Sequence, residues 1–325
     1  MKIRDYYLLG ELKNDNSGYA RWGFARKDGK EVFIKQFISP IYPLNESIIS
    51  EKQFQQKVNI CVNFERRKRF FYNQLNKCLT GNIVTVTDFF RDGSKYYIVT
   101  DKINMKVKKT IEIAVMGMKQ KLIIAKVILH CLSSLHKNGI VHNDLKPDNI
   151  LFKETQRGVL TAKIIDFDSG FLESDPPSLG EDLQGDMIYL SPEAYLFLAE
   201  ENDVLTRKID VFAMGIILHQ FFSGHIPAFD KEKYDYIFEA VLDGCEPVLD
   251  STIPGYINNL ISEMLNKDPE KRPTVEDAFE RLDPKPSTEN VFEEIYPDSE
   301  PAPINPASIK PKNGSDYFHP ADDLL

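Results

Sequence analysis

The chain has 325 residues, of which 42% are apolar and 27% charged, and its formal net charge is −9. This composition is typical of a globular protein with one large domain or two lobes around substantial cores. The negative charge argues against a nucleic-acid partner, and the apolar runs are too short for a membrane span or a signal peptide.

Four cysteines are scattered along the chain without CxxC spacing. They are Cys61, Cys78, Cys131 and Cys245. This spacing indicates buried thiols in a reducing compartment rather than a disulfide framework or a zinc site. We therefore expect a soluble, cytoplasmic protein that does not associate with a membrane, and the sequence leaves its oligomeric state open.

The first hundred residues are rich in predicted strands. Alternating apolar residues, with an Asp-Gly turn at residues 28–29, favour antiparallel hairpins. The predicted strands cover residues 6–12, 19–25, 31–37, 82–90 and 95–103. One principal helix is predicted over residues 62–79, because its large apolar residues recur at helical spacing.

Helical patterns dominate after residue 105. A helix is expected over residues 119–138, with Gly139 as its stop signal. Two short strands, 150–152 and 162–166, interrupt a helical series that continues to about residue 282. The fold class is therefore α+β.

The last 43 residues differ in composition from the rest of the chain. Residues 283–325 contain eight prolines, nine acidic residues and three basic residues. Such a segment is predicted to be a poorly ordered tail or one that lies along a surface.

The stretch "HNDLKPDNI", residues 142–150, carries clustered polar groups between two apolar segments. Phosphoryl transfer needs a carboxylate to orient a hydroxyl, oxygen ligands for Mg²⁺ and a cation near the phosphates. Asp144, Asn149 and Lys146 could supply these groups, together with Asp166 at the end of the later strand. Lys35, on an early strand, could supply a second cation.

The chain resembles eukaryotic-type serine/threonine protein kinases over about residues 5–282. The motifs occur in the order of that family: "VFIK", "HNDLKPDN", "IDFD", "YLSPE", "DVFAMG" and "DPEKRPT". The resemblance implies a bilobal protein-kinase domain over residues 1–282. Its strand-rich N-lobe would cover about residues 1–101, and its mostly helical C-lobe about residues 104–282.

The resemblance assigns roles to the clustered polar residues. Asp144 would orient the substrate hydroxyl and accept its proton, and Lys146 would steady the phosphoryl group. Asn149 and Asp166 would hold Mg²⁺. Lys35 would contact the nucleotide phosphates and pair with a glutamate of the N-lobe helix.

The identity of that helix glutamate stays open between two residues. Glu65 fits the predicted helix, although it lies 30 residues after Lys35, and Glu51 is the alternative.

The resemblance implies three further roles in the C-lobe and between the lobes. Glu193 would form a buried ion pair with Arg272, Asp210 would anchor the catalytic loop, and His142 and Phe167 would pack between the lobes.

The family pattern also places the nucleotide. Thr100 would stand at the back of the adenine pocket, and the backbones of Asp101 and Ile103 would hydrogen-bond the base. The other expected nucleotide contacts are Gly18, Ala20 and Leu151.

The chain departs from the family pattern at several positions. Only Gly18 remains of the glycine-rich loop. Asn143 replaces the arginine that usually grips a phosphate on the activation loop, so we expect no activation by phosphorylation there. Asp168 replaces a glycine, which should restrict the conformational freedom of the turn. Its carboxylate could tighten metal binding or face solvent, and we expect it to face solvent. Phe33 occupies the usual alanine position above adenine.

The motifs predict an ATP- and Mg²⁺-dependent kinase acting on Ser or Thr of protein substrates. Lys146 within "DLKPDN" favours Ser/Thr over Tyr in this family. One alternative is a small-molecule kinase, but such enzymes generally lack the "YLSPE" and "DVFAMG" elements. Another is a pseudokinase scaffold, which the departures favour and the intact polar set opposes.

Overall fold

The computed structural model divides the chain into two units, Met1–Ser287 and Thr288–Leu325. The predicted tail, residues 283–325, lies outside the described residues. The described residues are 1–14, 20–44, 50–78, 80–104, 106–154, 160–178, 183, 185–202 and 204–282.

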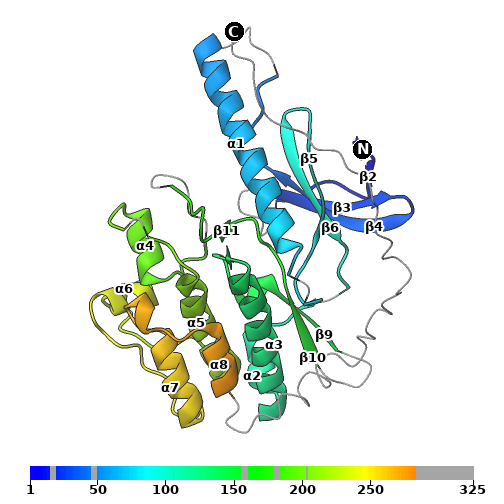
Figure 1. The fold of residues 1–325 in the computed structure, drawn as a ribbon. Helices are drawn as coiled ribbons and strands as arrows, with labels where there is room; N and C mark the ends of the chain where they lie inside the picture. Colours follow the sequence, from blue (N-terminus) through cyan, green and yellow to red (C-terminus); the bar gives the residue numbers. More distant parts are fainter. Residues whose placement is uncertain are drawn as a thin grey trace, which may run out of the picture. The chain divides into compact units, whose positions relative to one another are not determined.

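The N-lobe contains a six-stranded antiparallel sheet in the order β1-β2-β3-β4-β6-β5 (Figure 1). All five predicted strands are present, although β2 ends at Leu8 rather than at residue 12 and β5 begins at Val86 rather than at residue 82. The short strand β1 was not predicted. Asp28 and Gly29 have φ of 51° and 79°, as a tight hairpin between β3 and β4 requires. The strands are β1 (Lys2–Ile3), β2 (Tyr6–Leu8), β3 (Ala20–Lys27), β4 (Lys30–Phe37), β5 (Val86–Asp92) and β6 (Lys95–Asp101).

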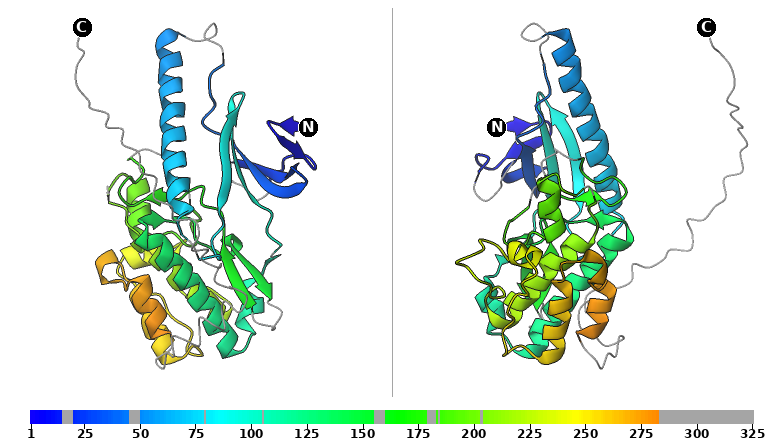
Figure 2. Two further views of the ribbon diagram at one scale, coloured as in Figure 1. Left: turned by 45° about the vertical axis from the view of Figure 1, so that its right-hand side comes forward. Right: turned by 90° about the vertical axis from the view of Figure 1, so that its left-hand side faces the viewer.

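The described part of the N-lobe has one helix, α1 (Glu51–Leu75). It begins 11 residues before the predicted start at residue 62 and ends before the predicted end at residue 79. The cause of the early start is a capping box. The side chain of Ser50 accepts from the Gln53 amide at 3.3 Å, and the Gln53 side chain accepts from the Ser50 amide at 3.3 Å. Figures 1 and 2 show α1 alongside β5.

The two faces of β4 pack against different neighbours. Ile34 is fully buried in a cluster of sheet residues that includes Val99. Lys35 and Phe37 point to the opposite face, because side chains alternate along a strand. There the ring of Phe64 on α1 meets Phe37 at 5.4 Å between centroids. This alternation directs Lys35 away from the sheet's apolar cluster.

The C-lobe is mostly helical, as predicted. Its central helix, α5 (Lys208–Ser223), is apolar on all sides and almost wholly buried. Gly215 lets α5 approach α7, since a Cβ there would lie 3.0 Å from the Cβ of Met264. The other helices are α2 (Thr110–Ala114), α3 (Met118–Lys137), α4 (Pro192–Leu198), α6 (Ile237–Leu242), α7 (Gly255–Met264) and α8 (Val275–Arg281). Two 3₁₀ turns are η2 (Pro147–Asn149) and η3 (Pro269–Lys271).

Two small sheets in the C-lobe position the polar loops. One has the order β10-β9-β7, and the other pairs β11 with β8. Residues 142–149 therefore lie between β8 and β9, and residues 165–170 between β10 and β11. These strands are β7 (Lys106–Val107), β8 (Ile140–Val141), β9 (Ile150–Glu154), β10 (Leu160–Ile164) and β11 (Phe171–Leu172).

The architecture is the predicted α+β arrangement, with a strand-rich N-lobe and a mostly helical C-lobe. Cys61, Cys78 and Cys131 are buried as predicted, but Cys245 is exposed, which corrects the prediction for that residue. Among the residues that the structure describes, no helix combines the length and apolar character needed to cross a bilayer.

Candidate active site

Lys35 joins the N-lobe sheet to the loop after β10. Its Nζ lies 2.8 and 3.0 Å from the two carboxylate oxygens of Asp166 and 2.7 Å from Oδ2 of Asp168. Burial alone would lower the pKa of Lys35, but the charges of Asp168 and Asp166 outweigh it and raise the pKa. The buried amine is therefore a cation with two carboxylate partners.

Two expectations differ from this arrangement. Asp168 does not face solvent: its side chain is 16% exposed and binds Lys35. Glu65 pairs with Arg69 at 3.4 Å, and Lys35 has carboxylate partners only in the Asp166–Asp168 turn among the described residues. The alternative, Glu51, is exposed in the first turn of α1. In this structure Lys35 pairs with neither Glu65 nor Glu51, which corrects the expected pairing.

Asp144 and Asn149 are joined directly. The Asn149 Nδ2 donates to Oδ2 of Asp144 at 3.0 Å and to the Asp144 carbonyl at 2.7 Å. These bonds turn the amide oxygen of Asn149 away from Asp144. Together with the Asp166 carboxylate, this oxygen is the type of ligand that Mg²⁺ prefers, so the donor set fits the expected metal.

Lys146 lies beside the Asp144 carboxylate. Its Nζ is 3.1 Å from Oδ2 of Asp144 and 3.7 Å from Oδ2 of Asp186. Burial alone would lower the pKa of Lys146, but Asp144 in particular raises it. The amide of Asp186 donates to Oδ1 of Asp144 at 3.1 Å, so both oxygens of Asp144 are held.

Asp210 of α5 anchors the loop that carries Asp144, as expected. Its carboxylate accepts from the amides of His142 and Asn143, each at 2.9 Å, and lies 2.9 Å from Nε2 of His136. Burial alone would raise the pKa of Asp210, but the bonds from His136 and the His142 amide lower it. Asn143 sits at φ 67°, a left-handed conformation that asparagine tolerates.

His142 and Phe167 pack together, as expected, with ring centroids 4.7 Å apart.

The loop that follows Asp166 needs a glycine at Gly170 rather than at residue 168. A Cβ at Gly170 would lie 2.6 Å from Cζ of Phe71 on α1 and 3.1 Å from the carbonyl oxygen of Val141. This close approach fits α1 against the loop that holds Asp166.

The predicted ion pair between Glu193 and Arg272 is confirmed. The guanidinium binds both carboxylate oxygens, at 2.6 and 2.8 Å, and Arg272 is 2% exposed. The pair connects the start of α4 to the turn after η3 and lies against Phe212 of α5. It is a structural element of the C-lobe.

The expected nucleotide-contacting residues lie mainly on strands. Thr100 and Asp101 end β6, Ala20 begins β3, and Leu151 lies in β9. Ile103 follows β6 and is half-buried. Gly18 lies outside the described residues. Their proposed contacts with nucleotide remain predictions.

Phe33 is part of an aromatic group on the same sheet face as Lys35. Its ring stacks on Trp22 at 5.8 Å and meets Phe24 edge-on at 5.9 Å. Register pairs Trp22 with Lys35 and Phe24 with Phe33, which places all four side chains on one face. The sheet face that is expected to cover adenine is therefore lined by aromatic rings in this chain.

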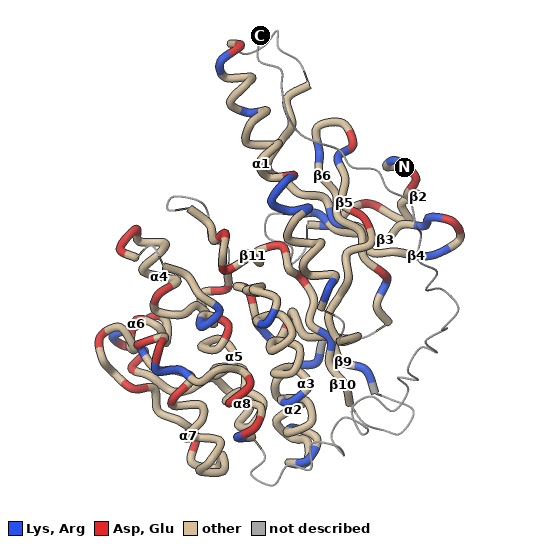
Figure 3. Tube along the Cα trace, viewed as in Figure 1, with Lys and Arg blue, Asp and Glu red and all other residues tan. Residues whose placement is uncertain are grey.

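The segment after the Asp166 loop is held by side chains from distant elements. The Asn143 amide donates to the Ser169 carbonyl at 3.3 Å, and Arg67 of α1 donates to the Asp175 carbonyl at 3.1 Å. Arg207 binds the carboxylate of Glu173. Figure 3 shows the basic run on α1 that contains Arg67.

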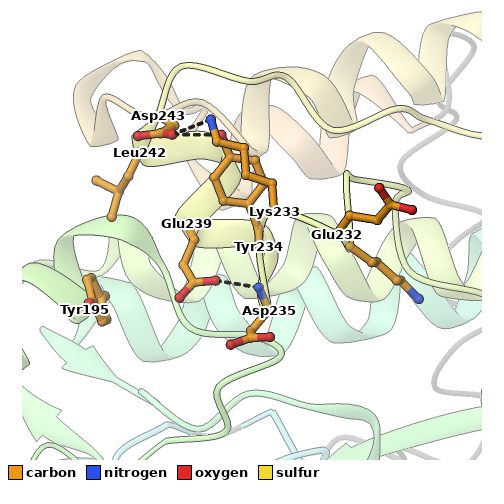
Figure 4. Close-up of a pocket in the computed structure, with 9 residues that line it drawn as sticks. Tyr195, Glu232, Lys233, Tyr234, Asp235, Glu239, Leu242 and Asp243 are labelled. Carbon is orange, nitrogen blue, oxygen red and sulfur yellow. Dashed lines mark hydrogen bonds and ion pairs between the residues drawn. The ribbon is translucent and has the colours of Figure 1, made fainter.

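A surface pocket of about 340 Å³ lies elsewhere in the C-lobe (Figure 4). It is lined by Tyr195 of α4 and by residues between Lys231 and Asp243. Within it, Lys233 pairs with Asp243 at 2.9 Å, and Glu239 accepts from the Asp235 amide at 2.8 Å. The predicted site residues do not line this pocket.

Comparison with known proteins agrees with this geometry. Residues 72–282 match the family model described as protein kinase domain. The chain belongs to the eukaryotic-type serine/threonine protein kinase family.

Two curated relatives illustrate the similarity. The probable serine/threonine-protein kinase fhkA of Dictyostelium discoideum is 28% identical, over 84% of this chain and 54% of its own length. The calcium/calmodulin-dependent serine/threonine-protein kinase of Malus domestica is 26% identical, over 86% of this chain and 72% of its own length. The chain thus spans about half the length of the first relative and nearly three quarters of the second.

Two residues of the site were not assigned these contacts from the sequence. Asp168 binds Lys35, and Lys68 of α1 donates to the Asp168 carbonyl at 2.5 Å. The signal for Asp168 was the acidic replacement within "IDFD". Lys68 carried no signal, because its partner lies 100 residues away.

Proposed function

We propose that this chain is an active, ATP-dependent protein kinase that transfers the γ-phosphoryl group to Ser or Thr of protein substrates. The observation that carries the proposal is a pair of linked polar groups. Lys35 binds Asp166, and Asp144 binds both Asn149 and Lys146. The Ile165 amide, beside Asp166, donates to the Asn149 carbonyl at 3.0 Å and so holds the two groups next to one another. Buried and clustered polar groups cost stability when they serve no ligand, so a fold without catalytic use has no physical need for the whole set.

Asp144 would orient the attacking hydroxyl and accept its proton. Both of its oxygens are fixed, by the Asp186 amide on one side and by Asn149 and Lys146 on the other. Fixed geometry lowers the entropy cost of bringing the hydroxyl to the phosphorus. Lys146, charged and adjacent, would stabilise the negative charge of the transferring group.

Asn149 and Asp166 would hold Mg²⁺, which neutralises charge on the phosphates when bound. Lys35 would contact the nucleotide phosphates, and its cationic state suits that contact. The expected base contacts, from Thr100 to Ile103, would place adenine beside the aromatic face that contains Phe33.

A second candidate is a kinase-like scaffold that binds nucleotide or a partner without transfer. The aromatic group of Trp22, Phe24 and Phe33 favours it, because bulky rings occupy the sheet face where the family usually has an alanine. The replacements of the family's usual residues by Asn143 and Asp168 also favour the scaffold.

One assay distinguishes the candidates. Purified protein is incubated with γ-labelled ATP and Mg²⁺ in the presence of a cell extract, beside Asp144→Ala and Asp166→Ala. We expect phosphoserine or phosphothreonine on protein with the wild-type chain and loss of label with both variants. Label on a metabolite would indicate a small-molecule kinase. Thermal stabilisation by nucleotide without transfer would support the scaffold.

A further inference from the structure

Two carboxylates share the one amine of Lys35. Asp166 offers both oxygens at 2.8 and 3.0 Å, and Asp168 offers Oδ2 at 2.7 Å. Lys35 is 7% exposed, so its charge has little access to water. A buried cation without a partner strongly destabilises the fold. With two carboxylates, Lys35 keeps one partner when the other is engaged elsewhere.

Helix α1 presents a lysine amine, not a carboxylate, to this pair of aspartates. Lys68 donates to the Asp168 carbonyl at 2.5 Å. Glu65, one turn earlier, is held by Arg69 at 3.4 Å. The helix thus contacts the backbone of the aspartate turn and leaves Lys35 to side chains of that turn.

We propose that Asp168 is the positioning residue for Lys35 in phosphoryl transfer, the part that the family resemblance had assigned to a glutamate on α1. This inference rests on the proposed function. During the reaction Asp166 would be engaged with the metal, and Asp168 would then remain as the carboxylate on Lys35. Lys68 fixes the backbone from which Asp168 extends.

The arrangement pairs Lys35 directly with side chains of the loop after β10, and α1 acts on Lys35 through its contact with that loop. Because Asp166 and Asp168 lie in one turn, that turn would serve both metal ligation and the positioning of Lys35. The carboxylate of Glu65 is then dispensable for positioning Lys35.

The first test uses the nucleotide-free protein and a double-mutant cycle. The melting temperature is measured for Asp168→Asn in the wild-type chain and in Lys35→Met. We expect the two changes in melting temperature to differ by at least about 2 °C, with the more negative change in the chain that retains Lys35. Glu65→Gln, the matched control, should change both chains equally. Equal effects of Asp168→Asn in the two chains, or coupling of Lys35 with Glu65 instead, overturn the pairing.

The second test separates binding from turnover with ATP, Mg²⁺ and a protein substrate. Asp168→Asn should lower kcat by about tenfold or more with a smaller change in the KM for ATP, because a misplaced group weakens the transition state most. Asp168→Glu, which retains the charge, should recover part of the loss. Glu65→Gln should change kcat by less than about threefold, since a residue outside the pair contributes no positioning.

A larger loss of kcat in Glu65→Gln than in Asp168→Asn contradicts the inference. Absence of transfer by the wild-type protein contradicts the proposed function instead, and the nucleotide-free cycle still decides whether Asp168 holds Lys35. The two failures are therefore distinguishable.

Discussion

The carboxylate of Asp144 is held at both oxygens, and this fixed orientation has a measurable consequence. Asp144→Asn preserves the size of the side chain but removes its basicity, so kcat should fall by about 10²–10⁴-fold. Steady-state phosphorylation of a protein substrate measures the effect, with circular dichroism to confirm folding.

Asp148→Asn is the matched control for that experiment. Asp148 is exposed and lies four residues from Asp144 on the same loop. Its substitution should leave kcat within about twofold of wild type, as is usual for surface changes. Equal losses in the two variants would mean that Asp144 has no special role.

The buried ion pair of Glu193 and Arg272 should stabilise the fold more than an exposed ion pair does. Glu193→Gln leaves a fully buried guanidinium without its counter-charge and should cost about 3–5 kcal/mol of unfolding free energy. Urea unfolding measures it. Glu263→Gln, which breaks the exposed pair with Arg281, should cost less than about 1 kcal/mol. A cost below 1 kcal/mol for Glu193→Gln would argue against the buried pair.

For individual residues, the sequence predicted most of the polar side chains of the candidate site, because the motifs fix residue types at fixed spacing. Asp210 holds the backbone of the loop that carries Asp144, and Glu193 pairs with Arg272, as the motifs imply. The roles of Asp144 and Asn149 toward substrate and metal stay predictions. Asp168 was expected to face solvent, and the prediction was wrong. Its partner, Lys35, is 133 positions earlier, and local pattern carries no information about a contact of that range.

At the scale of elements, α5 supplies the carboxylate that holds the catalytic loop, and its ionisation should appear in the acid stability. The pKa of Asp210 is lowered in the fold. A group with a depressed pKa contributes stability above its unfolded pKa, near 4, and loses it as the pH falls through the folded pKa. The unfolding free energy should therefore decrease below about pH 4, and Asp210→Asn should make this decrease shallower. Urea unfolding across pH 2–6 measures both slopes, and identical slopes would contradict the assignment.

The segment after the Asp166 loop is anchored without phosphate. Asn143 binds the Ser169 carbonyl, and Arg67 and Arg207 hold residues further along. Replacing Ser169, Ser174 and Ser178 together with alanine should therefore retain activity within about threefold, because these contacts use backbone and carboxylate groups. Kinase assays on protein produced in bacteria and in eukaryotic cells check this. Abolished activity in the triple variant would show that the segment needs phosphorylation.

Helix α1 shows why element boundaries were harder to predict than element types. The apolar spacing located the helix but placed its start at residue 62. The capping box of Ser50 and Gln53 sets the true start at Glu51. Phe54, Val58 and Cys61 continue the helical spacing into this mostly polar stretch, and the prediction did not use them. The early start also accounts for the long separation between Lys35 and Glu65.

At the scale of the whole molecule, the lobes meet through Lys35 and the aspartate turn, and through α1 and the segment that it contacts. The change from strand-rich to helical segments followed from the order of the predicted elements, because consecutive elements pair or pack locally. The division into two lobes followed from the resemblance of the motifs to protein kinases. The contacts between lobes did not follow, since they join residues 100 or more positions apart.

We propose that Lys35, Asn149 and Asp166 form a binding site for a magnesium-bound triphosphate. Calorimetric titration with a non-hydrolysable ATP analogue, with and without Mg²⁺, tests it most directly in the wild-type protein and in Asp166→Asn. We predict that Mg²⁺ tightens binding by about tenfold or more in the wild-type protein and by much less in Asp166→Asn, because the variant has lost a ligand charge. Binding that is absent, or equally dependent on Mg²⁺ in both proteins, would contradict the account.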